Sequence, residues 1–298
     1  MDATTRLASS STLEEVLAVA DRRTVPGDDV DLAVAVWEGD EDVVVFAHAT
    51  GFHKEIWAPT VRALRAMDVA ATLVAVDLRG HGDSPEPDRG PSVWDYAGDV
   101  ARVAETFGRR GRLVGVGHSL GGMAVAGCQA RFGPFDAVVV IDPALLPPSA
   151  VEAMRTVGNP WAEAARRRRP GFETSEEACR TFAAKEVFST WADGVLRLYV
   201  EHGFRQTRDG WMLKCRPAWE AATFSQEDFG EVWEAVEGLG GSVTLVTAEH
   251  SVTHPNELAE ETADHLGADH VRLPGITHFV PMEAPEAVAV EVRRRLGR

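Results

Sequence analysis

The sequence has 298 residues, of which 45% are hydrophobic and 26% charged, a composition typical of a soluble globular protein with one large domain or one domain that carries an insertion. The formal net charge of −16 argues against nucleic acid as a partner, and no apolar run is long enough to span a membrane. The start of the chain does not resemble a signal peptide, and three cysteines without metal-like spacing predict a reducing, cytoplasmic setting.

Short apolar runs alternate with helix-length segments through the first half of the chain. A short amphipathic helix is expected at 13–20, ahead of the first strand. The expected strands are 32–37, 43–48, 72–76, 113–116 and 137–141, and the expected helices are 55–67, 93–107 and 120–132. Because the strands are almost continuously apolar, the pattern predicts an α/β fold with a mostly parallel central sheet and helices on both of its faces.

This alternation stops after residue 143 and resumes near residue 241. The stretch between shows helical segments at 180–188, 195–202 and 229–236, and no convincing strand. Strands at 243–247 and 270–273 then alternate with helices at 257–266 and 285–296. We therefore expect a core domain of residues 1–143 and 241–298, with a helical lid of residues 144–240 inserted after the sixth strand.

The expected lid is rich in aromatic residues and contains one basic run. The aromatic residues are Trp161, Phe172, Phe182, Trp191, Tyr199, Phe204, Trp211, Trp219 and Phe224. We expect most of them to pack the lid onto the core, and some to line an apolar pocket. The run of four arginines at 166–169 is interpreted as a solvated helix face near the end of a helix.

Ser119 lies in a Gly-x-Ser-x-Gly motif that falls between an expected strand and an expected helix. Gly117 and Gly121 leave room where a Cβ would collide with the backbone of a tight turn. Such a strand–turn–helix arrangement raises the serine hydroxyl above the sheet and directs the N-terminus of a helix at developing negative charge. The sequence therefore predicts Ser119 as a catalytic nucleophile.

A serine nucleophile needs a base that takes its proton. His278 follows the last expected strand and lies on a loop, which suits a base located late in the chain. His48 and His81 also follow strands, but both precede the serine. His118 flanks the nucleophile, where a side chain is more often packed than catalytic. We therefore expect His278 to be the base.

Four separated motifs resemble those of the α/β-hydrolase superfamily and together span nearly the whole chain. They are residues 48–52 (His-Ala-Thr-Gly-Phe), residues 77–84 (Asp-Leu-Arg-Gly-His-Gly-Asp-Ser), the motif around Ser119, and residues 275–283. The layout is similar to that of lidded members such as small esterases, C–C bond hydrolases, haloalkane dehalogenases and epoxide hydrolases. The resemblance implies the α/β-hydrolase fold.

The resemblance also assigns roles to residues near the nucleophile. It implies an oxyanion hole made by the backbone N–H groups of Thr50 and Leu120, with Phe52 as an alternative to Thr50. His48 and residues 77–84 are expected to shape loops beside the site. Phe52, His118 and Trp191 are expected to contact the substrate.

The acid of the triad departs from the pattern usual in this family. The family's acid normally follows the seventh strand, but there the sequence reads Ala-Glu-His-Ser-Val, with Ser251 at the expected position. Asp142, directly after the sixth strand, is the preferred candidate because some family members place their acid there. Glu249 is the alternative, and an incomplete triad is a third reading. The acid would fix the tautomer of the imidazole and stabilise the imidazolium.

The predicted function is hydrolysis of a carboxylic ester or thioester of a small to medium apolar molecule through an acyl-enzyme. A serine nucleophile argues against dehalogenase and epoxide hydrolase chemistry, which requires a carboxylate nucleophile. C–C bond hydrolysis and acyl transfer to another acceptor use the same triad, and a slow ligand-binding sensor is an alternative from another class. No metal or organic cofactor is implied, the expected partner is a small-molecule substrate, and a homodimer is allowed.

Overall fold

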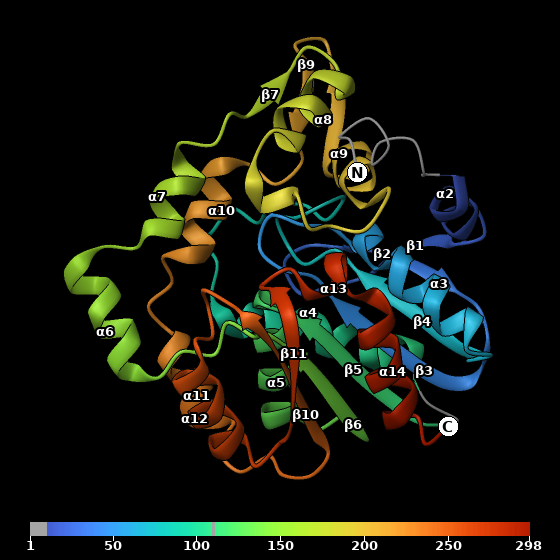
Figure 1. Ribbon diagram of the computed structural model, residues 1–298, viewed down its shortest axis with the longest axis vertical. Coiled ribbons are helices and arrows are strands. Elements are labelled where there is room, and N and C mark those ends of the chain that lie inside the picture. Colours follow the sequence, from blue (N-terminus) through green and yellow to red (C-terminus); the bar gives the residue numbers. More distant parts are fainter. Residues whose placement is uncertain (1–10, 109–110) are drawn as a thin grey trace.

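The computed structural model describes residues 11–108 and 111–298. Its centre is an eight-stranded sheet with the strand order β1-β2-β4-β3-β5-β6-β10-β11 (Figure 1). The strands are β1 (Asp21–Val25), β2 (Leu32–Trp37), β3 (Asp40–Ala47), β4 (Ala71–Val76), β5 (Leu113–His118), β6 (Ala137–Ile141), β10 (Val243–His250) and β11 (Asp269–Thr277). β2 pairs antiparallel with β1 and β4, and every other pairing in this sheet is parallel.

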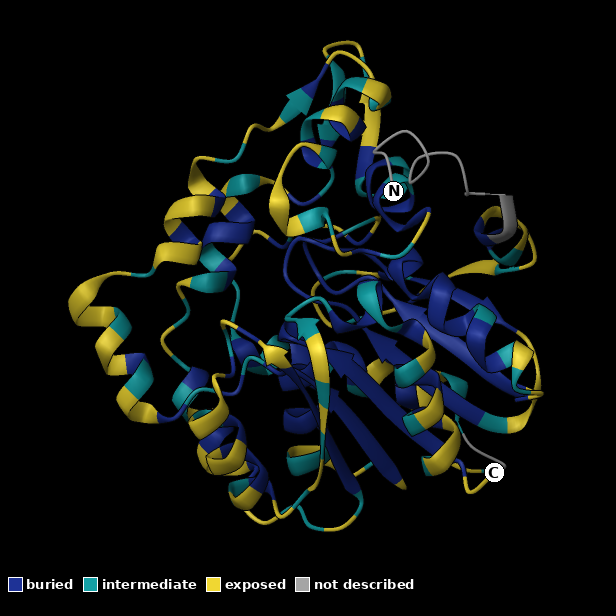
Figure 2. Cartoon of the chain, in the orientation of Figure 1, coloured by how far each residue is buried: buried dark blue, intermediate teal, exposed yellow. Residues whose placement is uncertain are grey.

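The middle strands of this sheet are buried on both faces. All residues of β4, β5 and β6 are buried, and Figure 2 shows the strands as the darkest part of the molecule. Within β3, Val44 and Phe46 belong to one hydrophobic core, whereas Val43, Val45 and Ala47 belong to the other. This division follows from the alternation of side chains along a strand, and a parallel sheet with apolar strands needs both faces covered.

Helices supply that cover. One face is packed by α2 (Ser11–Ala18), α3 (Ala58–Ala66), α13 (Val280–Glu283) and α14 (Pro285–Arg295). The other is packed by α4 (Val93–Phe107), α5 (Leu120–Phe132), α11 (Phe229–Ala235) and α12 (Asn256–Leu266). The predicted fold class, a mostly parallel sheet with helices on both faces, is confirmed. α11 joins this core layer, although it falls inside the range predicted for the lid.

The chain between β6 and β10, called the insertion below, is more varied than the sequence predicted. Its helices include α6 (Pro148–Val157), α7 (Pro160–Arg166), α8 (Ser175–Ala183), η2 (Glu186–Phe188), α9 (Val195–Gly203) and α10 (Pro217–Phe224). It also holds a small antiparallel sheet of β7 (Gly171–Phe172), β8 (Phe204–Thr207) and β9 (Gly210–Leu213). The expectation of no strand in this stretch was therefore wrong.

The insertion is fastened to the core beside the carboxyl ends of the central strands. Lys214 Nζ lies 2.5 Å from Asp83 Oδ1, and the backbone N–H of Ala192 donates to Met282 O at 2.8 Å. The Cβ of any other residue at Gly80 would lie 2.0 Å from Trp219 Nε1, so the two parts touch closely. Over residues 11–108 and 111–298, no helix combines the length and apolarity that crossing a bilayer requires.

Candidate active site

Ser119 lies at the tight turn between β5 and α5. Its φ of 53° and ψ of −114° are unusual for a residue with a side chain. The turn depends on its two glycines: a Cβ at Gly117 would lie 2.1 Å from Gly121 O, and a Cβ at Gly121 would lie 2.1 Å from Ala47 O. Strain of this kind persists where the surrounding structure enforces it, which is typical of functional turns.

Asp142 and His278 meet beside this turn. His278 Nδ1 lies 2.5 Å from Asp142 Oδ2. The Asp142 side chain is fully buried and that of His278 is 15% exposed. Burial acts to raise the pKa of the Asp142 carboxyl, but the hydrogen bond and charge of His278, together with the charge of His254 and the hydrogen bond from Ser251, offset it, so the pKa lies below its usual value. Asp142 is thus held as a carboxylate that faces the ring of His278.

Ser251, which the sequence did not single out as functional, is a second partner of the Asp142 carboxylate. Ser251 Oγ donates to Asp142 Oδ2 at 2.5 Å and accepts from the backbone N–H of His254 at 2.8 Å. Ser251 stands where the acid is usually expected, which was the only sequence signal for it. In this chain that position supplies a hydrogen-bond donor to an acid carried by the neighbouring strand.

Glu249, the alternative acid, is engaged elsewhere. Its Oε2 accepts a hydrogen bond from the backbone N–H of Gly275 at 2.8 Å, and the residue is exposed. This bond links the end of β10 to β11 ahead of His278. The structure therefore brings Asp142, and not Glu249, to the histidine.

Two backbone N–H groups near Ser119 are free to bind an oxyanion. Those of Thr50 and Leu120 donate to no acceptor in the described part of the chain. The N–H of Phe52, the alternative to Thr50, is occupied because it donates to Ala49 O at 3.1 Å. Leu120 is the first residue of α5, so its N–H also carries the positive end of the helix dipole.

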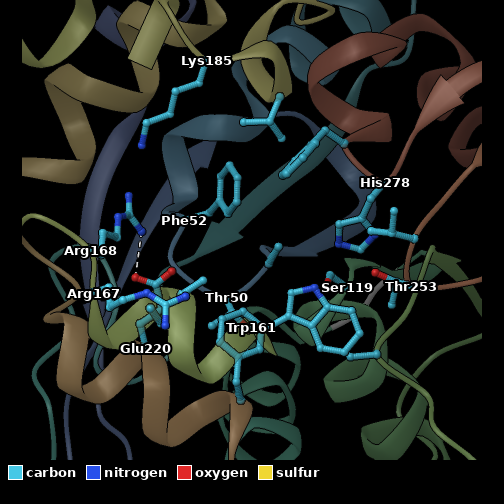
Figure 3. A pocket seen from close by; sticks show the side chains of 18 of the residues that line it. Thr50, Phe52, Ser119, Trp161, Arg167, Arg168, Lys185, Glu220, Thr253 and His278 are labelled. Carbon is cyan, nitrogen blue, oxygen red and sulfur yellow. Dashed lines mark hydrogen bonds and ion pairs between the residues drawn. The ribbon is translucent and has the colours of Figure 1, made fainter. Parts of the chain in front are cut away.

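Ser119 and His278 open onto one cavity of about 700 Å³ between the core and the insertion (Figure 3). Thr50 and Phe52 line it as well. Its size suits a small to medium organic molecule.

His118 and Trp191, both predicted to contact the substrate, do not belong to the cavity wall. His118 is buried, and since burial lowers its pKa to about 3, it is neutral and donates from Nε2 to His278 O at 2.8 Å. Trp191 is buried among aromatic rings, 5.9 Å from Phe52 and 4.8 Å from Phe188 between centroids. Both side chains are packed in the interior. Of the three residues expected to contact the substrate, Phe52 is therefore the one that lines the cavity.

The two other motifs shape loops near the site. His48 Nε2 accepts from the N–H of Leu78, and burial lowers the pKa of His48 far enough to keep it neutral. Asp77 accepts from the ammonium of Lys54 at 2.7 Å and from the N–H of Asp83 at 2.7 Å. Among residues 11–108 and 111–298, no group of three or more His, Cys, Asp or Glu side chains could hold a metal ion.

Comparison with known proteins gives three results. Residues 44–292 match the model of a family described as the alpha/beta hydrolase family. A 2-(acetamidomethylene)succinate hydrolase from Mesorhizobium japonicum is 28% identical over 255 residues, which cover 84% of this chain and 86% of that protein. A bifunctional esterase/perhydrolase from Acinetobacter calcoaceticus is 37% identical over 106 residues, 35% of this chain and 37% of the relative.

Solved structures show the same architecture. The crystal structure of E-2-(acetamidomethylene)succinate hydrolase has a TM-score of 0.73 at 23% identity and covers 94% of this chain and 100% of its own. A thioesterase domain from the curacin biosynthetic pathway has a TM-score of 0.73 at 17% identity, with coverages of 92% and 99%. At these identities the likeness concerns the fold.

Proposed function

The chain belongs to the alpha/beta hydrolase family and is a hydrolase, and from this premise we propose that it cleaves its substrate through an acyl-enzyme on Ser119. His278 is the proposed base, Asp142 the acid that orients it, and Thr50 and Leu120 the oxyanion donors. One observation carries the proposal: a buried carboxylate holds His278 at 2.5 Å beside a strained serine that opens onto the same cavity.

The proposed reaction has two balanced steps. Ser119 Oγ bonds to the substrate carbonyl carbon while its proton passes to Nε2 of His278, the ring nitrogen that does not face Asp142. The Thr50 and Leu120 N–H groups receive the oxyanion, and the leaving alcohol or thiol departs with the proton from Nε2. Water then gives a proton to Nε2 while its oxygen bonds to the acyl carbon. The bond from that carbon to Ser119 Oγ breaks, Oγ takes the proton back from Nε2, and the carboxylic acid is released.

A carboxylic ester or thioester is the proposed bond. The size of the cavity and the aromatic rings around it support a small to medium, partly apolar substrate. The relative from Mesorhizobium japonicum is named for hydrolysing a succinate derivative and the Acinetobacter relative for esterase and perhydrolase activities, so members of this family share the scaffold but not one substrate. A cytoplasmic location and a homodimer stay predictions from the sequence.

Pre-steady-state kinetics with p-nitrophenyl esters of graded acyl length test the proposal. We expect a burst of p-nitrophenol, an acyl adduct in the intact mass, and loss of both in Ser119→Ala. Ser149→Ala, which removes an exposed serine from α6, is the matched control and should keep both. A folded protein that forms neither adduct nor product from any ester of the series contradicts the proposal.

The same kinetic assay, extended to other acceptors and substrates, separates the rival functions. A ligand-binding sensor would bind the esters and release negligible product. An acyltransferase would give a new ester or amide when an alcohol or amine is added, visible by mass spectrometry of the products. A C–C bond hydrolase would cleave a β-diketone faster than any ester.

A further inference from the structure

The cavity wall has a sign of charge opposite to that of the chain. The sequence holds 46 acidic and 30 basic residues, and its net charge is −16. Among the described residues that line the cavity, Glu220 is the single carboxylate, whereas four side chains are cationic: Arg167, Arg168, Arg169 and Lys185. Three of these four belong to the arginine run that the sequence interpreted as a solvated helix face. Arg167 and Arg169 fit that interpretation, because their side chains are 72% and 54% exposed and each forms an ion pair, with Glu163 and Glu177 respectively.

Arg168 is the member of the run that departs from that interpretation. Its side chain is 17% exposed, and it donates to Glu220 Oε2 at 2.7 Å and to the hydroxyl of Tyr199. These two partners fix the guanidinium in the wall and use two of its five N–H groups. The Glu220 carboxylate therefore orients the Arg168 guanidinium, which keeps further N–H donors for a ligand.

Lys185 is an exposed residue of the cavity wall and adds a further positive charge. Its ammonium lies 5.1 Å from the ring centroid of Phe182, and the guanidinium carbon of Arg168 lies 5.9 Å from the same centroid. No carboxylate of the described residues lies within ion-pair distance of Lys185. Figure 3 shows Lys185 and Arg168 at one end of the cavity and Ser119 with His278 at the other, with Phe52 between.

We propose that the substrate carries a free carboxylate at the end remote from the scissile carbonyl, and that Lys185 and Arg168 receive it. This inference rests on the proposed function, because the distance between the charged end and Ser119 defines which carbonyl is attacked. A monoester or monothioester of a linear dicarboxylic acid has the required chemistry: an anionic end, an apolar middle and a reactive carbonyl. The largely shielded guanidinium of Arg168 would form a charge-assisted hydrogen bond stronger than in bulk water, and the exposed Lys185 would add attraction for the carboxylate.

Paired substrates test the inference directly. The p-nitrophenyl monoesters of linear dicarboxylic acids with four to eight carbons are compared with the same molecules capped as methyl esters, so that only the remote charge differs. We expect the wild type to prefer the free carboxylate by about tenfold or more in kcat/KM for at least one length. Lys185→Met should abolish most of this preference, and Lys185→Arg should retain it.

Arg166→Met is the matched control, because it removes a positive charge from the same run at a residue that does not line the cavity. It should leave the preference unchanged. If both members of every pair are hydrolysed equally, and Lys185→Met changes nothing, the inference is overturned while the proposed function stands.

Measuring the binding of uncleaved esters to Ser119→Ala tests the carboxylate site even if the proposed function is wrong. If no ester is hydrolysed, calorimetric titration with the monomethyl and dimethyl esters of the same four- to eight-carbon acids still measures recognition of the charge. A preference of tenfold or more for the monomethyl ester of at least one acid, lost in Ser119→Ala/Lys185→Met, supports the inference. Equal affinities for the two esters of every acid overturn it.

Discussion

Ser119 and Asp142 share an uncommon backbone conformation. Only three non-glycine residues have a positive φ in the described chain, and two of them are Ser119 at 53° and Asp142 at 41°. The two are tied together: the Ser119 N–H donates to Ile141 O at 2.9 Å, directly before Asp142. Two residues with a strained backbone, directly after the neighbouring strands β5 and β6, thus lie beside His278.

Substitution of the acid distinguishes the two carboxylates. We expect Asp142→Asn to lower kcat by about 10²- to 10⁴-fold, since an amide cannot hold the productive tautomer or stabilise the imidazolium. Glu249→Gln should change kcat by less than about threefold, because Glu249 contacts the Gly275 amide and not His278. Steady-state kinetics that showed the larger loss in Glu249→Gln would refute the assignment of the acid.

Ser251 provides a second prediction about the acid. Ser251→Ala removes a donor to Asp142 Oδ2, so we expect kcat to fall by about tenfold with KM unchanged. Ser251→Thr keeps a hydroxyl and should recover part of the loss. A rise in KM without a fall in kcat would show instead that Ser251 shapes the substrate site.

At the scale of elements, the turn between β5 and α5 has no room for a Cβ at either of its two glycines. We expect Gly121→Ala to destabilise the protein by about 3 kcal/mol or prevent folding, because its Cβ would overlap Ala47 O. Gly98→Ala, inside α4 and with no atom within 4 Å of the added Cβ, should instead stabilise by about 0.5–1 kcal/mol. Urea denaturation measures both, and equal effects would contradict this view of the turn.

Elements were predictable where periodicity was strong. Residues 93–107 and 137–141 match α4 and β6, because an amphipathic stripe and a β-branched run leave little choice. β1 was missed since four of its five residues are exposed and three are charged. The hairpin of β8 and β9 did carry a signal, because Asp209 lies in its two-residue turn and Gly210, with a φ of 104°, follows directly.

In the candidate site, too, some residues could be predicted from local sequence and others could not. Ser119 and His278 are recognisable from local motifs, whereas the choice between Asp142 and Glu249 depends on how far β6 and β10 carry each carboxylate, which only the sheet determines. The hydrogen bond of Ser251 and the ion pair of Arg168 were not foreseen, because each depends on a partner far away in the sequence. Long-range pairing leaves no local pattern.

At the scale of the whole molecule, buried histidines predict acid sensitivity. Burial lowers the pKa of His254 to about 4, and both of its ring nitrogens are buried without partners in the described chain. The unfolded state, with a pKa near 6.5, binds the proton first, so stability falls as pH drops from about 6.5 to 4. Between pH 7 and pH 5 this histidine should cost about 2 kcal/mol.

His254→Leu tests this linkage, since it removes the titrating group and leaves no polar atom behind. We expect the free energy of unfolding of the variant to drop by about 2 kcal/mol less than that of the wild type between pH 7 and pH 5. The measurement is urea denaturation at the two pH values. Equal losses in the two proteins would show that His254 does not contribute.

The central claim is that one serine, activated by a histidine and a buried aspartate, performs the chemistry of this hydrolase. Labelling with a fluorophosphonate, followed by peptide mass spectrometry, tests it most directly. We expect one adduct, on Ser119, absent in Ser119→Ala and formed far more slowly in Asp142→Asn than in Glu249→Gln. An adduct on another residue, or labelling that persists in Ser119→Ala, would contradict it.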